Sequence, residues 1–229
     1  MNWDAPPKPA ELSENRLIRA ILDGVFPIDS NLPPERELAV SLGVTRPTLR
    51  ETLQRLARDG WLDIRQGKPT RVRDYWREGN LGVLAAIVQN PDRLPADFSA
   101  NMLAIRSLLA PAFTRLAVDR LPSQVVELLQ PFQKLEDDPR VFTEWDWRLQ
   151  IELTLLSGNP VFTLIYNSFA KLYLLLGVAY FQHASNRQLS QQFYRDLLDC
   201  AKARDGLGAE QLVYRMMQTS QVLWDQVHL

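Results

Sequence analysis

Apolar residues recur with the spacing of an α-helix through most of the 229-residue chain. The first helical pattern begins near Glu11 and ends at Gly24. Its apolar face consists of Leu12, Leu17, Ile18, Ile21 and Leu22. A second helix begins at Pro34, with Glu35 in its first turn, and ends at Leu42. Gly43, which tolerates a left-handed turn, separates it from a third helix.

The third helix has its own start and stop signals. Thr45 is a good N-cap, and Pro47 is tolerated in the first turn, where the N–H groups have no helical partner. Gly60 ends the helix. Its inward face consists of Leu49, Leu53 and Leu56.

After Gly60 the pattern changes to that of a β-hairpin. Trp61, Leu62 and Ile64 predict a short strand, "RQGKP" a turn, and "TRVRDYW" the returning strand. Three helices followed by a hairpin is the order of a winged helix-turn-helix. From Leu81 onward the pattern is helical throughout, with Pro111 inside one helix. We expect six or seven helices there, near 81–89, 96–120, 122–136, 139–156, 160–183, 187–204 and 208–227.

The sequence therefore predicts a mostly α protein, with an N-terminal winged helix-turn-helix joined to an all-α bundle. The predicted parts are a flexible arm (1–9), the winged domain (10–73), a linker (74–80) and the helical domain (81–229).

Charge is distributed unevenly although the net charge is only −1. From Leu32 to Arg73 nine basic and five acidic residues give +4, so the remainder carries −5. A basic module beside an acidic body indicates a polyanion partner for the first part only. The chain has no long apolar run and no signal-peptide pattern, so we expect a cytoplasmic protein without a membrane partner.

Few side chains are suited to catalysis or metal binding. One cysteine, Cys200, and two histidines, His183 and His228, are present. They allow no disulfide and no multi-histidine site. No nucleophile with a base and an orienting group is found, and a carboxylate pair from Glu144, Asp146 and Glu152 fits an acidic helix face better. We expect no enzyme.

The segment "LGVTRPTLR" has the features of a DNA-reading helix. Arg46 and Arg50 project from one face at its start, and the arginine fork matches guanine O6 and N7. Thr45 and Thr48 suit phosphate oxygens at the helix N-terminus. In the hairpin, Gly67 permits close approach to the duplex and Lys68 supplies charge. Arg36, in the preceding helix, is a further candidate.

The stretch "LPPERELAVSLGVTRPTLRETLQRLARDGWLDIRQGKPTRV" resembles the DNA-binding domain of the GntR family of bacterial transcription regulators, most closely its FadR branch. The resemblance implies that Arg36, Arg46 and Arg50 read the operator, that Thr45 and Thr48 contact its backbone, and that Gly67 enters the minor groove. Pro47 and Gln66 stand where the branch often has threonine and histidine. Pro47 has no N–H to donate, and Gln66 still offers a hydrogen bond. The resemblance also implies a homodimer on a pseudo-palindromic operator.

A large sub-branch of the family binds a metal in its effector domain through one aspartate and three histidines. Here Asp146 is kept, but Gln150 and Tyr194 occupy two of the histidine positions. An amide and a phenol are poor replacements for imidazole, so we expect no metal.

The FadR branch responds instead to long-chain acyl-CoA, an effector rather than a cofactor. The resemblance implies ligand contacts for a set of residues in four helices: Arg106, Tyr180, Tyr194, Ser220 and Trp224. Met217 stands at a ligand position that is glycine in that branch. Fatty acid metabolism genes are then the expected targets, repressed for degradation and activated for synthesis.

Several alternatives remain open at this level. Arg106 would equally well pair with an acidic neighbour across helices, and the aromatic residues would equally well be core. The regulator would then answer a different metabolite or none. A non-specific architectural DNA binder is also open, although it needs no apolar effector bundle.

Overall fold

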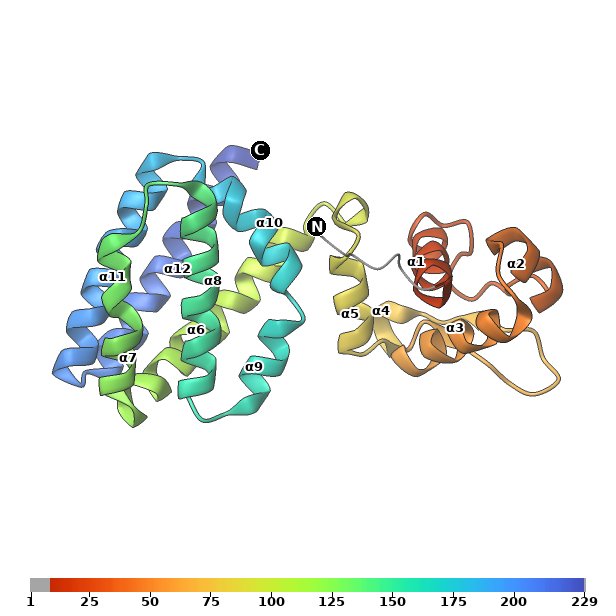
Figure 1. Cartoon of the computed structure of the whole chain (residues 1–229), viewed down its shortest axis with the longest axis horizontal. Helices are drawn as coiled ribbons and strands as arrows, with labels where there is room; N and C mark the ends of the chain where they lie inside the picture. Colours follow the sequence, from red (N-terminus) through yellow and green to blue (C-terminus); the bar gives the residue numbers. More distant parts are fainter. Residues whose placement is uncertain (1–8, 229) are drawn as a thin grey trace, which may run out of the picture. The chain divides into compact units, whose positions relative to one another are not determined.

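The computed structural model of this chain describes residues 9–228, with side chains through Trp224. It divides into two compact units, the first ending at Arg93 and the second beginning at Leu94 (Figure 1). The predicted arm lies outside the described residues except for Pro9, which begins the first helix.

Three helices and a hairpin build most of the first unit, as predicted. The elements are α1 (Pro9–Leu22), α2 (Glu35–Leu42), α3 (Arg46–Asp59), β1 (Leu62–Asp63), β2 (Arg71–Val72), α4 (Tyr75–Glu78), α5 (Leu81–Val88) and a 3₁₀ turn (Pro91–Arg93). The C-caps Gly43 and Gly60 have φ values of 68° and 99°, in the left-handed region. Thr45 caps α3 by accepting a hydrogen bond from the backbone N–H of Thr48.

The core of the first unit lies between α1, α3 and the hairpin. Leu49 and Leu56 of α3 and Trp61 after it are completely buried. Ser13 of α1 forms a buried hydrogen bond of 2.7 Å with Thr52 of α3. The prediction that Leu12 belongs to the buried face is wrong, because its side chain is 42% exposed and Ser13 occupies the interior.

The hairpin is shorter than the sequence predicts. Its strands are antiparallel, with Leu62 opposite Val72 and Asp63 opposite Arg71. The predicted returning strand stops early because Tyr75 and Trp76 turn into α4, where Tyr75 packs on Trp61 at 4.8 Å between ring centroids. The predicted linker 74–80 thus contains a helical turn, and the chain up to Arg93 belongs to the first unit.

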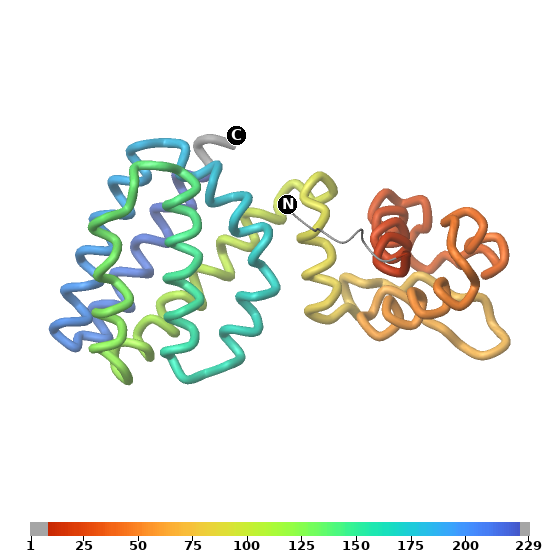
Figure 2. Tube along the Cα trace, viewed as in Figure 1, coloured from red at the N-terminus to blue at the C-terminus, as the bar shows by residue number. Residues whose placement is uncertain are grey.

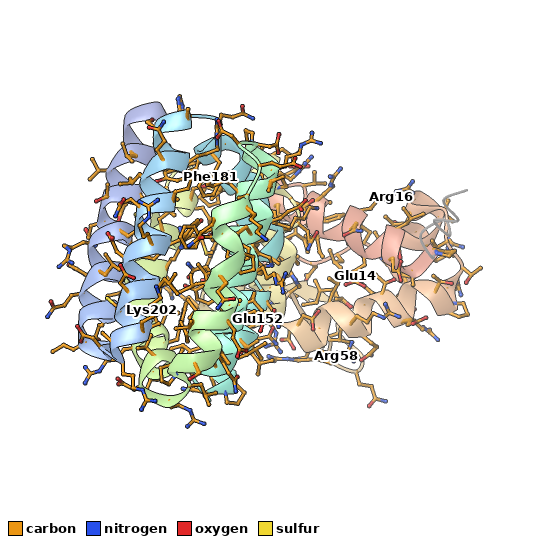
Figure 3. The ribbon with its side chains drawn as sticks, turned by 60° about the vertical axis from the view of Figure 1, so that its left-hand side comes forward. Glu14, Arg16, Arg58, Glu152, Phe181 and Lys202 are labelled. Atoms are coloured by element: carbon orange, nitrogen blue, oxygen red, sulfur yellow. The ribbon has the colours of Figure 1, made fainter. Side chains whose placement is uncertain are left out.

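The second unit is entirely helical among its described residues (Figure 2). Its elements are α6 (Phe98–Arg120), α7 (Pro122–Leu129), a 3₁₀ segment (Gln130–Lys134), α8 (Pro139–Leu156), α9 (Pro160–Asn167), α10 (Ala170–Phe181), α11 (Ala184–Ala203) and α12 (Gly206–His228). The long helices α6 and α12 pack along each other. Phe181 is buried, whereas Lys202 lies on an exposed face of α11 (Figure 3).

Two predicted helices are interrupted. The helix predicted at 160–183 is two helices, α9 and α10, bent by 70°. At this break Ser168 donates its hydroxyl to the carbonyl of Leu164, which competes with continuation of the backbone ladder. The helix predicted at 122–136 changes to 3₁₀ geometry at Gln130, where Pro131 has no N–H for the ladder.

Over residues 9–228 no individual helix has the length and apolar composition needed to cross a membrane. Only the bent pair α9 and α10, taken together, reaches that length and composition.

The two glycine caps of the helix-turn-helix are predicted to differ in their tolerance of a side chain. A Cβ at Gly60 would lie 3.0 Å from the Cα of Gly79, whereas a Cβ at Gly43 meets nothing within 4 Å. Gly43→Ala is expected to lower the free energy of unfolding by about 1–2 kcal/mol, because alanine disfavours the left-handed backbone conformation. Gly60→Ala is expected to lower it further, because the new Cβ also meets the Gly79 backbone. Urea unfolding of both variants checks this. Equal loss of stability would contradict it.

Candidate functional site

The exposed face of the helix-turn-helix begins at the N-terminus of α3. Gly43 and the Thr45 cap fix where this helix starts, and Arg46 and Pro47 are exposed on its first turn. The hydroxyls of Thr45 and Thr48 lie 2.9 Å apart at the N-terminus of this helix. The predicted arrangement of an arginine beside two threonine hydroxyls is therefore present in three dimensions.

Arg50 lies one turn further along α3 and has a protein partner. Its Nε donates to Oε2 of Glu35 in α2 at 2.8 Å, while its side chain remains 69% exposed. An exposed pair of this kind contributes little to stability, so the guanidinium remains available to another acceptor. Arg36 is exposed on α2, beside Glu35.

The hairpin projects a basic, exposed loop. Gln66, Gly67 and Lys68 are all exposed, and Gly67 has a φ of 74°, which suits glycine. At the base of the hairpin Asp63 lies 2.8 Å from the guanidinium of Arg65 and 3.9 Å from that of Arg71. Asp63 therefore offsets positive charge at the base of the hairpin, whereas Lys68 lies exposed at its tip.

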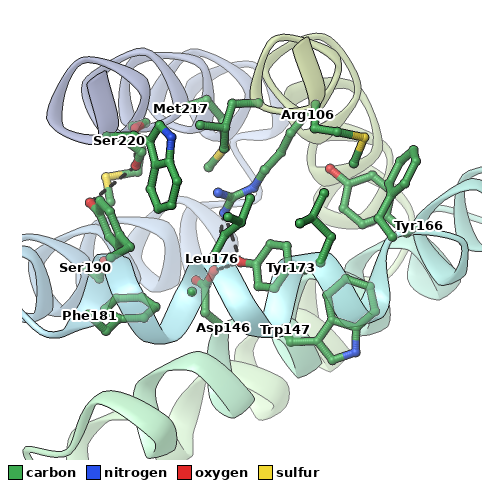
Figure 4. A pocket seen from close by; sticks show the side chains of 18 of the residues that line it. Arg106, Asp146, Trp147, Tyr166, Tyr173, Leu176, Phe181, Ser190, Met217 and Ser220 are labelled. Atoms are coloured by element: carbon green, nitrogen blue, oxygen red, sulfur yellow. Dashed lines mark hydrogen bonds and ion pairs between the residues drawn. The ribbon is translucent and has the colours of Figure 1, made fainter. Parts of the chain in front are cut away.

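The second unit contains a largely apolar cavity of about 70 Å³ (Figure 4). Of the predicted ligand residues, five line it: Arg106, Tyr180, Met217, Ser220 and Trp224. Tyr194 is completely buried and does not line the cavity, but reaches it through Asp146. Residues from α6 and from α8 through α12 form the wall.

Asp146, on α8, is the polar centre of this cavity. Its Oδ1 accepts a 2.8 Å hydrogen bond from the hydroxyl of Tyr194. Its Oδ2 accepts one from the hydroxyl of Tyr173 and one, at 3.3 Å, from Nη2 of Arg106. Nη2 of Arg106 also lies 3.1 Å from the Tyr173 hydroxyl. The carboxylate thus connects α6, α8, α10 and α11. It is also the acidic partner of Arg106 across helices that the sequence left as an alternative.

Burial and charge keep these groups in defined protonation states. Burial raises the pKa of Tyr194 well above its usual value, and the nearby Asp146 carboxylate raises it further. Burial lowers the pKa of Arg106, but its interactions with Tyr173 and Asp146 outweigh this and raise it above its usual value. At neutral pH Tyr194 is therefore a neutral donor and Arg106 a cation.

Two buried groups beside the cavity have unused hydrogen-bonding capacity. Nε of Arg106 and the hydroxyl of Tyr166 have no hydrogen-bond partner among the described residues. Such groups are uncommon in folded proteins, because each costs desolvation energy that nothing repays. Both side chains belong to residues that line the cavity.

Gln150, which was expected at a metal-ligand position of the related sub-branch, is buried, and its Oε1 has no hydrogen-bond partner in the described part of the chain. Within residues 9–228 no three His, Cys, Asp or Glu side chains are grouped to hold a metal ion. Tyr194 donates a hydrogen bond to Asp146. The carboxylate is engaged by phenols and a guanidinium.

Sequence reasoning missed Tyr173 and Tyr166 as members of this site. Both lie in apolar stretches and have the spacing of core residues. The signal that pointed to them was indirect, since a cation such as Arg106 inside a bundle requires polar partners.

Comparisons with known proteins agree with both units. Residues 12–72 match the model of bacterial regulatory proteins of the gntR family, and residues 73–229 match that of the FadR C-terminal domain. A fatty acid metabolism regulator protein of Shewanella pealeana is 40% identical over 217 residues, covering 94% of this chain and 90% of the relative. The protein of the same name from Shewanella oneidensis is 40% identical, covering 96% of this chain and 91% of the relative. A solved Listeria monocytogenes structure, of Lar, shares the fold with a TM-score of 0.64 at 13% identity, covering 98% of this chain and all of that one.

Tyr194→Phe is predicted to destabilise the second unit. The change leaves one oxygen of a buried carboxylate without its donor, which costs about 1.5–3 kcal/mol for a hydrogen bond to a charged group. Tyr214→Phe, at a half-exposed position of α12, is the matched control and is expected to have almost no effect. Urea unfolding measures both, and equal stabilities would show that the Asp146 hydrogen bond contributes nothing.

Proposed function

This chain belongs to the GntR family of bacterial regulatory proteins and carries the C-terminal domain of its fatty acid metabolism regulators, and we propose that long-chain acyl-CoA releases it from operator DNA. It is a DNA-binding transcription regulator, and its family is not one of enzymes. The observation that carries the proposal is the apolar cavity of the second unit, in which Arg106 is paired with Asp146. The same chain has a DNA-binding domain whose α3 has a capped N-terminus and an exposed arginine.

The geometry of α3 supports its contact with DNA. An α-helix fits the major groove, and an arginine on its first turn reaches guanine edges in bidentate fashion. Arg46 has this position, and Arg50 joins it by exchanging Glu35 for an acceptor on the DNA. Thr45, Thr48 and Arg36 then contact the adjacent backbone or groove, and Gln66, Gly67 and Lys68 place the wing. Pro47 donates no N–H, so its contact is apolar.

A homodimer on a pseudo-palindromic operator completes this arrangement. Two copies related by a two-fold axis place two α3 helices in successive major grooves, one helical turn apart. Dimerisation also doubles the number of phosphate contacts, which dominate affinity and make it salt-dependent.

The effector part of the proposal rests on the cavity of the second unit. Its wall is mostly Leu, Met and aromatic side chains, which suit an acyl chain. Its volume of about 70 Å³ is well below the roughly 300–1,000 Å³ of ordinary ligand sites. An acyl chain must therefore displace side chains of the wall, which on α12 include Met217 and Trp224.

This need for expansion makes a switch possible. A ligand changes the population of two states only if it binds them with different affinity. The compact cavity disfavours the ligand, so acyl-CoA stabilises an expanded arrangement of α10 and α12. We propose that the expanded arrangement is incompatible with operator binding, and that the chain connecting the two units, including the predicted linker 74–80, transmits the change.

Met217 favours one alternative within the same family. Its buried thioether fills part of the cavity where the related branch has glycine, so a smaller apolar metabolite is the runner-up effector. The chain-length dependence of binding separates the two.

Arg46→Ala is predicted to remove operator preference. The loss of one bidentate base contact costs about 1–3 kcal/mol at the specific site and far less on unrelated DNA. Arg58→Ala, an exposed arginine at the opposite end of α3, removes the same charge and is the control. Gel-shift titration on operator and shuffled duplexes measures both. Equal losses for the two variants would contradict the direct role of Arg46.

Palmitoyl-CoA is predicted to release the protein from its operator, and Met217→Ala to lower the concentration required. Removing the thioether enlarges the cavity, so we expect the gain to be greatest for the longest chains. Val222→Ala, on an exposed position of α12, is the control. Fluorescence anisotropy of labelled operator across chain lengths gives the result. No release at any length would refute the effector assignment.

A further inference from the structure

An open, basic pocket of about 360 Å³ lies at the base of the hairpin, beside the loop that precedes α2. The residues that line it are Asn31, Asp63, Arg65, Lys68, Pro69 and Arg71. Among these described residues three are cations and one is an acid, so the lining has a formal charge of +2. Asp63 thus offsets only part of the positive charge, and the excess favours an anionic occupant.

The backbone on the two sides of this pocket is fixed by hydrogen bonds between the loop and β2. Asn31 forms an antiparallel bridge with Arg71, and the N–H of Val72 donates to the carbonyl of Ser30 at 2.9 Å. The loop therefore lies along β2 as a short third strand. The walls of the pocket keep their separation before any ligand arrives, which lowers the entropic cost of binding.

Carboxylates hold the two guanidinium groups of the pocket without using all their donors. Oδ2 of Asp63 lies 2.8 Å from Nη2 of Arg65 and 3.9 Å from Nη2 of Arg71. Oδ1 of Asp29 accepts a hydrogen bond of 2.9 Å from Nη1 of Arg71. The side chain of Asp63 is only 14% exposed, whereas those of Arg65 and Arg71 are 62% and 41% exposed. Because a guanidinium has five N–H groups, both arginines retain donors for a further acceptor.

We propose that this pocket binds one phosphate of the operator backbone through Arg65 and Arg71, with Asp63 as the residue that positions them. The planar fork of arginine matches phosphate oxygens in bidentate fashion. Lys68 connects the pocket with the DNA-facing side of the hairpin, because it lines the pocket and follows Gly67 at the tip. The proposal rests on the proposed placement of the wing on DNA. A backbone contact carries no sequence information, so this one adds affinity for every duplex and specificity for none.

The first test measures how DNA binding by the full-length protein depends on salt. Arg65→Gln removes one charge at an exposed position and nearly keeps the length of the side chain. The logarithm of the association constant falls with that of the salt concentration by about 0.9 per phosphate contact, so we expect the slope to decrease by about 0.9 for each bound copy. Affinity is expected to fall about fivefold on operator and shuffled duplexes alike.

Arg77→Gln is the control for this test, because Arg77 is an arginine of α4 that is 86% exposed and does not line the pocket. It removes an equal charge and is expected to leave the slope unchanged. An unchanged slope for Arg65→Gln, an equal decrease for both variants, or a loss of affinity confined to the operator would overturn the proposal.

The second test locates the phosphate. A series of operator duplexes each carries one neutral methylphosphonate linkage, moved stepwise along both strands. The unaltered protein is expected to lose about fivefold in affinity at one linkage in each half-site, and Arg65→Gln to lose nothing further there, because the two changes remove the same contact. A free anion in the pocket would produce no such coupling to a defined linkage. If no linkage couples to Arg65, the pocket does not bind the operator backbone.

Lys68→Gln, measured on the same duplexes, separates this proposal from the function on which it rests. If Lys68 couples to a linkage and Arg65 does not, the phosphate pocket is refuted while the placement of the wing stands. If neither couples, the placement of the wing is refuted as well. Circular dichroism reports whether each variant is folded, and Arg71→Gln, which is expected to couple to the same linkage, replaces Arg65→Gln if that variant does not fold.

Discussion

One buried carboxylate determines how the second unit is organised. Asp146 projects from α8 into a bundle of Leu, Met and aromatic side chains, where an unpaired charge would be prohibitive. Its three donors come from three further helices, as Arg106 of α6, Tyr173 of α10 and Tyr194 of α11. These helices must therefore keep a fixed distance from α8, and the small cavity is the space that this arrangement leaves next to the polar centre. Any ligand that enters must preserve or replace this network.

The first unit depends on a different kind of constraint. Its helix-turn-helix is defined by local features, two left-handed glycines and a threonine cap, and by completely buried leucines on α3. The polar groups on the opposite face remain exposed and only weakly paired, as the Arg50–Glu35 contact shows. One face of α3 is therefore held rigidly in the core, while the opposite face keeps its arginines exposed. A helix that contacts DNA bases requires both.

Features that depend on neighbouring residues were predictable from the sequence, whereas features that depend on contacts between distant residues were not. Gly43, Thr45 and Gly60 act on the adjacent backbone, so the boundaries of α3 were predictable from neighbouring residues. The break between α9 and α10 was not predictable, because it involves the hydrogen bond from the Ser168 hydroxyl to the carbonyl of Leu164, which only the structure reveals. The partner of Arg106 lies 40 residues away, so the sequence established only that a partner was needed. Tyr173 had no distinguishing signal, because its stretch "LYLLLGVAYF" has the composition of core.

The most direct measurement of the central claim is a crystal structure of the protein with a long-chain acyl-CoA bound. The account predicts the acyl chain in the cavity between α6, α10 and α12, with Met217 displaced. A chain bound elsewhere would contradict it.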